Sequence, residues 1–370
     1  MHVHIFSLST RHHIEPLLAF LQENVLPRYG PREHEFICCG QGSEVTTAWP
    51  TTAPMRTARG FAPIYGLLRR HLTAGHRLVI HGLYDRTLAL ALFLLLRKRH
   101  GATWVIWGSD MYPFLRPYPP LPHQFVNMWL RRSVFRRMDR IAGIPGDYAI
   151  LANDLPGQWK HSPLNFPLRL GYERYRELFR RSRQRSDNSL RIMLGNSASA
   201  TNRHGSALKM LSRFSGEAIE LVMPLSYAGT TQYVEAVIAE ARRLFGDRLT
   251  VLDQVMPSDE YLRLLAHIDI LVFNHKRQEG VGTINSALML GKKVYLHSDV
   301  STYAHLINLG VEVHDTATIN DASFAEFARW DRKRVLENQK AVYAACGQEA
   351  VAEQYFSLFS AIDNDAPAIG

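Results

Sequence analysis

The stretch of sequence that decides the fold is residues 268–296, IDILVFNHKRQEGVGTINSALMLGKKVYL. It opens with an apolar run at 268–273 whose length and β-branched residues are typical of a buried parallel strand. A polar loop with two glycines follows, then a helical pattern over 283–290 and a second strand at 294–296. The free N–H groups of such a helix lie at the carboxyl edge of the sheet. The unit therefore predicts a site for a phosphate-bearing ligand.

The glycine turn of this unit, E-G-V-G-T at 279–283, has several charged residues beside it. It lacks the G-x-G-x-x-G spacing of a dinucleotide fingerprint and the G-K-[ST] of a P-loop. A G-x-G pair alone usually indicates only a tight turn, but its place after a buried strand favours an anion site here. The residues expected to hold the anion are Lys276, Arg277, Glu279, Gly280, Val281, Gly282 and Thr283.

A second turn of similar character, G-N-S-A-S-A-T-N at 195–202, follows the first strand of the second half of the chain. Its composition suits a nest of backbone N–H groups that binds an anion. It suits equally an ordinary turn in which Asn and Ser side chains bond to the local backbone. Both interpretations stay open, and under the first Gly195, Asn196 and Ser197 contact the ligand.

Length and composition indicate a globular protein of two domains. The chain has 370 residues, of which 46% are hydrophobic and 21% charged. Its three cysteines cannot form a disulfide framework, which favours a reducing compartment. The longest apolar run, at 88–96, is far shorter than the ~20 residues of a membrane-spanning helix. Residues 1–186 carry 26 Lys and Arg against 12 Asp and Glu, and the remaining residues are net acidic, so the first half is expected to meet an anionic surface.

Both halves alternate strands with helices, which predicts α/β architecture with two doubly wound parallel sheets. We expect a first domain at 1–180, a polar linker at 181–189, a second domain at 190–335 and a helical tail at 336–370 that crosses back. The loops at the carboxyl ends of both sheets are expected to line a cleft between facing domains.

Several motifs in order give the chain a specific resemblance. Residues 252–273, followed by E-G-V-G at 279–282, resemble the donor-binding half of a GT-B glycosyltransferase in the order of their expected strands, turn and helix. With H-G-L-Y-D-R-T at 81–87, W-G-S-D at 107–110, L-G-N-S at 194–197 and V-M-P-L-S-Y at 222–227, the chain resembles the TDP-N-acetylfucosamine:lipid II N-acetylfucosaminyltransferase family. The resemblance covers about residues 78–300.

This resemblance implies transfer of 4-acetamido-4,6-dideoxygalactose from a TDP-sugar to an undecaprenyl-diphosphate-linked saccharide, as in enterobacterial common antigen assembly. It implies retention of anomeric configuration and no metal or other cofactor. The turns at 195–197 and 279–283 would then hold the nucleotide diphosphate, and Pro224 and Tyr227 would lie near the base or sugar. The chain departs from many GT-B enzymes in having Asn285 and Ser286 where a second carboxylate stands.

Catalytic candidates lie at expected strand ends of the first domain. His81 and Asp110 are hypotheses for a base or for groups that orient the acceptor hydroxyl, and Glu279 joins them from the second domain. Asp85 lies close to His81 in the sequence. The alternative is that His81 and Asp110 only satisfy backbone groups at strand ends, which is common. With retention, the leaving phosphate could itself take the proton.

A basic helix expected over 127–141 suggests where the protein meets lipid. Its apolar residues share one arc, and Trp129 lies among arginines on the other. That arrangement suits a helix lying on an anionic bilayer, although an ordinary solvated face is at least as common. With a lipid-linked acceptor, this predicts a peripheral protein on the cytoplasmic face of the bacterial inner membrane. The membrane-facing residues would be Trp129, Arg132, Arg136, Arg137 and Arg140.

Other functional classes fit the sequence less well. No ligand spacing for a metal appears, and the D-N-D at 363–365 is interpreted as part of a polar tail. A GT-B-shaped nucleotide-sugar 2-epimerase would need no lipid surface. A nucleic-acid-binding protein, suggested by an isoelectric point near 9.5, would place its basic and aromatic residues on a recognition element that does not appear here.

Overall fold

The structure is a computed structural model that describes residues 1–40, 51–96, 101–112, 125–155, 157–182 and 189–365. Its contacts divide the chain into two units, residues 1–165 with 348–370 and residues 166–347. Each unit contains a parallel sheet with helices on both faces, so the predicted pair of Rossmann-like domains is confirmed. The cleft expected between the domains depends on their relative placement and stays a prediction.

The first unit is built on a parallel sheet of seven described strands. These are β1 (His2–Ser7), β2 (His34–Cys39), β3 (Met55–Ala58), β4 (Arg77–His81), β5 (Ala102–Val105), β6 (Arg140–Gly143) and β7 (Lys160–Pro163). Their order is β3-β2-β1-β4-β5-β6-β7, and it reverses direction between β1 and β4. The carboxyl ends of β1 and β4 are therefore where a doubly wound sheet binds its ligand.

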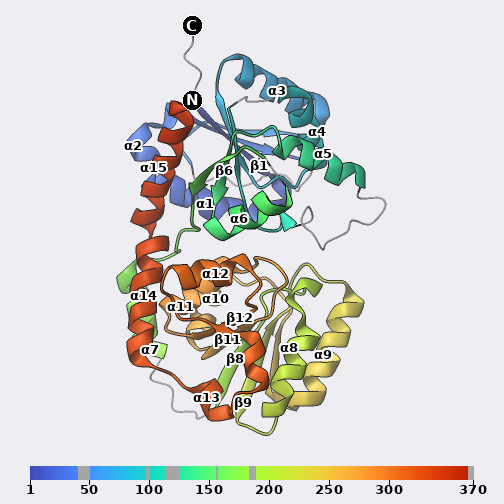
Figure 1. Ribbon diagram of the computed structural model, residues 1–370, viewed down its shortest axis with the longest axis vertical. Helices are drawn as coiled ribbons and strands as arrows, with labels where there is room; N and C mark the ends of the chain where they lie inside the picture. The colour runs from blue at the N-terminus through green and yellow to red at the C-terminus, as the bar shows by residue number, and fades with distance from the viewer. Residues whose placement is uncertain (41–50, 97–100, 113–124, 156, 183–188, 366–370) are drawn as a thin grey trace. The chain divides into compact units, whose positions relative to one another are not determined.

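Helices cover both faces of this first sheet (Figure 1). One face packs against α3 (Phe61–Thr73), α4 (Arg86–Leu95), α5 (Phe125–Phe135) and α6 (Pro145–Asp154). The other face packs against α1 (Arg11–Asn24), α2 (Leu26–Tyr29) and α15 (Gln348–Asn364). The last helix of the chain is thus part of the first unit's core.

One predicted helix is shorter than expected. The sequence predicts a helix over 127–141, whereas α5 ends at Phe135 and the chain enters β6 at Arg140. The buried run R-I-A-G pairs with β5 and β7, and this pairing overrides the helical pattern. The pattern also does not predict β3, β7 or α6, which are too short or too mixed in composition to stand out.

Four histidines lie buried on the face of the first sheet that α1 and α15 cover. The two ring nitrogens of His4 each lie 2.9 Å from another imidazole, Nδ1 from His81 Nε2 and Nε2 from His34 Nδ1. His2 Nε2 lies 3.0 Å from Asp363 Oδ1 on α15. Burial lowers the pKa of all four histidines, to about 3 for His34 and His81. These imidazoles are therefore neutral at neutral pH.

We expect this group of histidines to make the fold sensitive to mild acid. Below pH 6.5 the histidines of the unfolded chain bind protons, whereas the buried histidines of the folded chain do not. The free energy of unfolding therefore decreases as the pH is lowered. Each such histidine contributes a slope of ~1.4 kcal/mol per pH unit between that pH and its folded-state pKa. Urea unfolding at a series of pH values from about 8 to about 4 measures this slope.

The control for this prediction is a side chain of the same core that does not titrate. His81→Phe should flatten the slope, because it removes one imidazole that is neutral in the folded state. Phe6→Leu, at a buried ring stacked on His81, removes no imidazole and should leave the slope unchanged. Equal slopes in the wild type and in His81→Phe would contradict the assignment of neutral, buried imidazoles.

The second unit repeats the architecture with six described strands. These are β8 (Leu190–Leu194), β9 (Ile219–Pro224), β10 (Leu249–Leu252), β11 (Ile270–Phe273), β12 (Lys293–Leu296) and β13 (His314–Asp315). The order β10-β9-β8-β11-β12-β13 reverses direction between β8 and β11. One face packs against α8 (His204–Leu211), α9 (Thr231–Phe245) and α13 (Phe324–Ala328). The other packs against α7 (Tyr172–Ser182), α10 (Ser258–Ala266), α11 (Val281–Met289), α12 (Ser301–Asn308) and α14 (Arg332–Cys346).

The unit boundaries differ from those predicted. Helix α7 belongs to the second unit and not to the first, because Tyr175 is buried there and its hydroxyl lies 3.0 Å from Ser286 Oγ. The tail divides between α14, which packs on α11 in the second unit, and α15, which packs on α1 in the first. Of the predicted linker, residues 183–188 lie outside the described residues, and residues 181–182 belong to α7.

Candidate functional site

Two loops meet at the carboxyl ends of β8 and β11, where the order of the second sheet reverses. The strands are neighbours, and the Gly195 amide donates to the Val272 carbonyl at 3.1 Å. The loop after β8 therefore lies beside the loop after β11, and the Lys276 amide donates to the Thr201 carbonyl at 2.9 Å. The two turns that the sequence identifies are thus brought together at the place where doubly wound sheets bind nucleotides.

Asn202 joins the two loops through its side-chain amide. Its Oδ1 accepts from the Asn196 amide at 2.9 Å and from His275 Nε2 at 3.0 Å. Its Nδ2 lies 3.2 Å from Ser197 Oγ and 3.0 Å from Glu279 Oε2. Burial lowers the pKa of His275 to about 3, so this ring is neutral and carries its proton on Nε2. Asn202 and His275, neither of which is among the predicted site residues, therefore fix the geometry of both turns.

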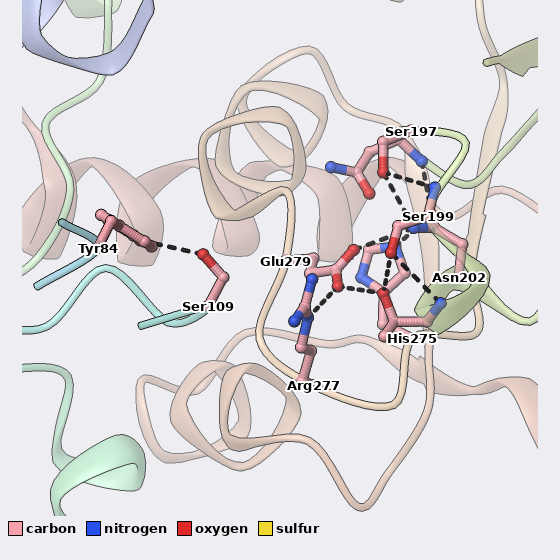
Figure 2. A network of polar contacts seen from close by, with 10 residues as sticks. Tyr84, Ser109, Ser197, Ser199, Asn202, His275, Arg277 and Glu279 are labelled. Carbon is pink, nitrogen blue, oxygen red and sulfur yellow. Dashed lines mark hydrogen bonds and ion pairs between the residues drawn. The ribbon is translucent and has the colours of Figure 1, made fainter. Parts of the chain in front are cut away.

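Glu279 is the second connection between the loops (Figure 2). Its carboxylate accepts from the Thr201 hydroxyl, from Arg277 Nε and from Asn202 Nδ2, and its side chain is only 9% exposed. A carboxylate held by three protein donors stabilises the paired turns and neutralises Arg277. The structure therefore gives Glu279 an orienting role, and the catalytic role predicted for it from the sequence stays a prediction.

Both turns contain a glycine at a position where the backbone φ angle is positive. Gly195 has φ 72°, and a Cβ there would lie 2.6 Å from His204 Nε2 and 2.7 Å from Asn202 Oδ1. Gly280 has φ 64° and is the N-cap residue of α11, which begins at Val281, two residues earlier than the sequence pattern predicts. The first-turn amides of α11, including those of Gly282 and Thr283, thus lie directly after this turn.

The remaining predicted donor-site residues differ in their exposure. Tyr227 is 45% exposed and hydrogen-bonds Asn196, and burial of its hydroxyl together with the nearby Glu279 charge raises its pKa. Lys276 is exposed, whereas Ser197 is buried beneath the turn. Pro224 is the last residue of β9 and is buried in the sheet, where it pairs with Leu252 of β10.

Asp110 is a support of the first sheet and not an exposed base. It is fully buried, and its carboxylate accepts from Trp104 Nε1 at 2.7 Å, from the Trp107 amide at 3.0 Å and from the Leu83 amide at 3.3 Å. Burial raises its pKa. The carboxylate holds the loops after β4 and β5 together, so a role as the base that deprotonates the acceptor is not supported by its position.

The other polar residues of these first-unit loops have separate roles. Asp85 caps α4, since its Oδ1 accepts from the Leu88 amide at 2.7 Å. The Tyr84 hydroxyl and Ser109 Oγ lie 3.0 Å apart, linking the two loops near their ends (Figure 2). His81 is fully buried at the end of β4 and bonds to His4, so it does not itself face solvent.

The predicted membrane-facing residues separate into two groups. Trp129 is 59% exposed on α5, and Arg132 and Arg136 lie along or just beyond the same helix. Arg137 instead donates to the Phe93 carbonyl and covers the Phe93 ring. Arg140 lies within β6, is 7% exposed and pairs with Asp365 at 2.6 Å. Both Arg137 and Arg140 are therefore bonded to groups of the first unit and do not form the exposed basic face that the helical pattern predicts.

The described residues also bear on metal binding and on membrane spans. Among the described residues, no group of three or more His, Cys, Asp or Glu side chains is placed to hold a metal ion. Within the same part of the chain, none of the helices combines the length and the apolar character needed to span a bilayer.

Comparison with known proteins places this geometry in a family. Residues 1–335 match the profile of a family described as 4-alpha-L-fucosyltransferase, glycosyl transferase group 56. The fold is similar to that of sucrose-phosphate synthase from Thermosynechococcus elongatus, with 13% identity, a TM-score of 0.71 and coverage of 99% of this chain and 100% of that one. It is also similar to a glycosyltransferase from Rickettsia africae ESF-5 and to alpha,alpha-trehalose 6-phosphate synthase from Burkholderia multivorans. Both are 11% identical, with TM-scores of 0.68 and 0.67 and coverage of 99% of each chain. These likenesses show the GT-B fold.

Proposed function

This chain belongs to the 4-alpha-L-fucosyltransferase family, glycosyl transferase group 56, and we propose which sugar it transfers and to what. It is a glycosyltransferase of the GT-B fold and acts on a nucleotide-sugar donor and an acceptor. The proposed donor is a TDP-linked N-acetylated deoxyhexose similar to 4-acetamido-4,6-dideoxygalactose. The proposed acceptor is a saccharide on a polyprenyl diphosphate, as in the synthesis of a cell-surface polysaccharide.

The paired turns at the ends of β8 and β11 carry this proposal. Backbone amides after Gly195 and in the first turn of α11 supply donors and a positive dipole end for a diphosphate. Lys276 and Arg277 add positive charge beside these amides, where negative charge develops on the leaving phosphate. Tyr227, half exposed next to Asn196, is placed to pack on the base or the sugar.

A screen of nucleotides tests this proposal. TDP should raise the melting temperature more than UDP or GDP does, and the matching TDP-sugar should be turned over when a polyprenyl-diphosphate glycan is added. The matched variant is Tyr227→Ala. It removes an exposed ring and leaves the buried hydrogen bonds of Asn202 in place. It should therefore weaken TDP binding by about tenfold without lowering the melting temperature. Stabilisation by GDP alone would contradict the proposed donor.

We propose that the outer surface of α4 and α5 binds an anionic membrane on the cytoplasmic face of the bacterial inner membrane. The two helices pack on each other, and Phe93 of α4 contacts Trp129 of α5 at 5.3 Å between ring centroids. Exposed arginines, including Arg86 and Arg136, lie on or just beyond these helices. Apolar and basic side chains together are what a bilayer with anionic headgroups binds. The exposed apolar side chains are Leu90, Leu94, Phe125, Val126 and Trp129, at 40 to 64% exposure.

Sedimentation with vesicles tests this surface. The double variant Leu94→Ser, Trp129→Ser should bind vesicles of phosphatidylglycerol and phosphatidylethanolamine about tenfold more weakly than the wild type, because both side chains are more than half exposed. The control is Leu336→Ser, at a side chain 42% exposed on α14 in the other unit, which should bind as the wild type does. Equal loss in both variants would place the membrane contact elsewhere.

A further inference from the structure

Two aromatic side chains lie at the carboxyl edge of the first sheet, close to the point where its strand order reverses. Trp107 follows β5 and Tyr84 follows β4, and both side chains are half-buried. Their ring centroids are 6.5 Å apart at an interplanar angle of 57°. This edge is where a doubly wound sheet binds its ligand, so the two rings lie where the first unit is expected to hold its substrate.

The indole of Trp107 packs against a buried pair of rings. Phe6 and His81 are stacked at 4.4 Å between centroids, and both are fully buried. The Trp107 ring meets Phe6 at 6.3 Å and 53° and meets His81 at 6.4 Å and 62°. Neither of these rings lies parallel to the indole, so they hold it in place without stacking on its face.

The loops that carry Trp107 and Tyr84 are fixed from the interior of the unit. The fully buried Asp110 carboxylate accepts from the Trp107 amide and from the Leu83 amide, which joins the loop after β5 to the loop after β4. The Tyr84 ring lies so close to Gly82 that a Cβ there would come within 2.5 Å of it. Both rings are therefore held in position before a ligand binds, which reduces the entropy lost on binding.

Hydroxyl groups lie at the border of this aromatic surface. The Tyr84 hydroxyl and Ser109 Oγ are 3.0 Å apart (Figure 2), and each hydroxyl can both donate and accept hydrogen bonds. A sugar offers C–H groups on the face of its ring and hydroxyls around it. Aromatic rings bordered by hydroxyls are therefore suited to a saccharide. We call Tyr84, Trp107 and Ser109 the aromatic platform.

A cationic side chain of α5 contacts the same loop. Arg131 is half-buried, and its guanidinium donates to the Tyr84 carbonyl. Its Nε is buried and has no hydrogen-bond partner among the described residues. Burial lowers the pKa of Arg131, and the negative charges of Asp110 and Asp85 oppose that shift. Arg131 therefore brings a positive charge and N–H donors to the platform, as the binding of an anion requires.

We propose that the aromatic platform binds the saccharide of the acceptor, and that Arg131 binds the diphosphate to which this saccharide is linked. The proposal rests on the proposed function, because that function supplies a saccharide on a polyprenyl diphosphate. Arg131 follows Trp129 by two residues on α5, and this spacing turns the two side chains ~200° apart around the helix. One helix thus presents Trp129 to the proposed membrane surface and Arg131 to the platform.

Saturation-transfer NMR with methyl N-acetylglucosaminide tests the platform. The ring protons of this sugar should receive saturation from the wild type, and Trp107→Leu should weaken its binding by about tenfold. The matched control is Trp330→Leu, at a side chain 37% exposed in the second unit, which should bind the sugar as the wild type does. If Trp107→Leu fails to fold, Tyr84→Phe removes one hydroxyl and no ring and should still weaken binding by about threefold. Wild-type affinity in folded Trp107→Leu or in Tyr84→Phe would overturn the platform.

Calorimetry with N-acetylglucosaminyl farnesyl diphosphate tests the role of Arg131. Arg131→Gln should bind this probe about tenfold more weakly and should bind the methyl glycoside as the wild type does, because only the first probe carries a diphosphate. Trp107→Leu should weaken both probes. The control is Arg70→Gln, at an exposed arginine of α3, which should leave both affinities unchanged. Wild-type affinity of Arg131→Gln for the farnesyl probe would overturn the diphosphate assignment.

TDP separates this proposal from the proposed function. The platform belongs to the first unit and the paired turns to the second, so Trp107→Leu and Arg131→Gln should keep wild-type affinity for TDP. Binding of both probes without binding of TDP would support the platform and contradict the proposed donor. Binding of TDP without binding of either probe would overturn the platform alone.

Discussion

Glu279→Ala is expected to weaken TDP binding by about 10- to 100-fold and to lower the free energy of unfolding of the second unit by about 2–4 kcal/mol. The carboxylate holds Thr201, Asn202 and Arg277 at once, and its removal leaves buried donors without an acceptor. The loops after β8 and β11 are then joined by fewer bonds, of which those of the Lys276 amide and of His275 remain, and the amides of both turns are less firmly oriented. Calorimetry with TDP and urea unfolding measure the two effects.

Two further variants separate the effect of Glu279 from a general loss of charge. Glu279→Gln keeps the shape and one acceptor oxygen, so it should lie between the wild type and the alanine variant in both measurements. Glu240→Ala removes an exposed carboxylate that pairs with Arg243 on α9 and should leave TDP affinity unchanged. If Glu279→Ala binds TDP as the wild type does, the turn at 279–283 does not hold the nucleotide.

Gly195→Ala is expected to have the next largest effect, with a loss of about 2–4 kcal/mol in stability and at least about tenfold in TDP affinity. An alanine would keep a strained φ near 72°, and its Cβ would meet His204 Nε2 at 2.6 Å and Asn202 Oδ1 at 2.7 Å. Asn202 would have to move, and its bonds to Asn196 and to His275 would break. Thermal unfolding and calorimetry with TDP test both parts.

Gly282→Ala is the matched control for this glycine. A Cβ at Gly282 meets no atom within 4 Å, and the residue lies in the first turn of α11. Alanine there should stabilise the helix by about 0.5–1 kcal/mol. If the diphosphate approaches this backbone, TDP affinity falls although stability rises. Equal stability of Gly195→Ala and Gly282→Ala would contradict the steric account of the first turn.

Local patterns in the sequence predict much of the donor site. The apolar run before the turn, the two glycines and the helix after them place α11 within two residues of its observed start. The G-N-S turn lies where the pattern indicates, and of its two open interpretations the one as an anion nest stays a prediction. Asn202 bonds to the local backbone, as in an ordinary turn, and the same bonds orient amides that can face an anion.

The basic helix shows where sequence periodicity fails. Residues 127–141 have the helical repeat throughout, yet β6 takes residues 140–143 because the sheet offers partners on both sides. Two of the five proposed membrane residues, Arg137 and Arg140, are consequently bonded to protein. The D-N-D at 363–365 is a second case in which the local pattern misleads. The pattern indicates a polar tail, whereas Asp363 bonds to His2 and Asp365 bonds to Arg140, each more than 200 residues away in the sequence.

By itself the sequence determined the α/β class, the two domains and the glycine turns, because strand length, helical period and glycine conformation are properties of neighbouring residues. Only the tertiary structure decided which side chains meet. Asn202 with Glu279, and His4 with His34 and His81, are separated by 30 to 77 residues and come together because adjacent parallel strands bring them side by side. The physical reason is that a polar side chain is oriented by its partners, and in a parallel sheet those partners lie on other strands.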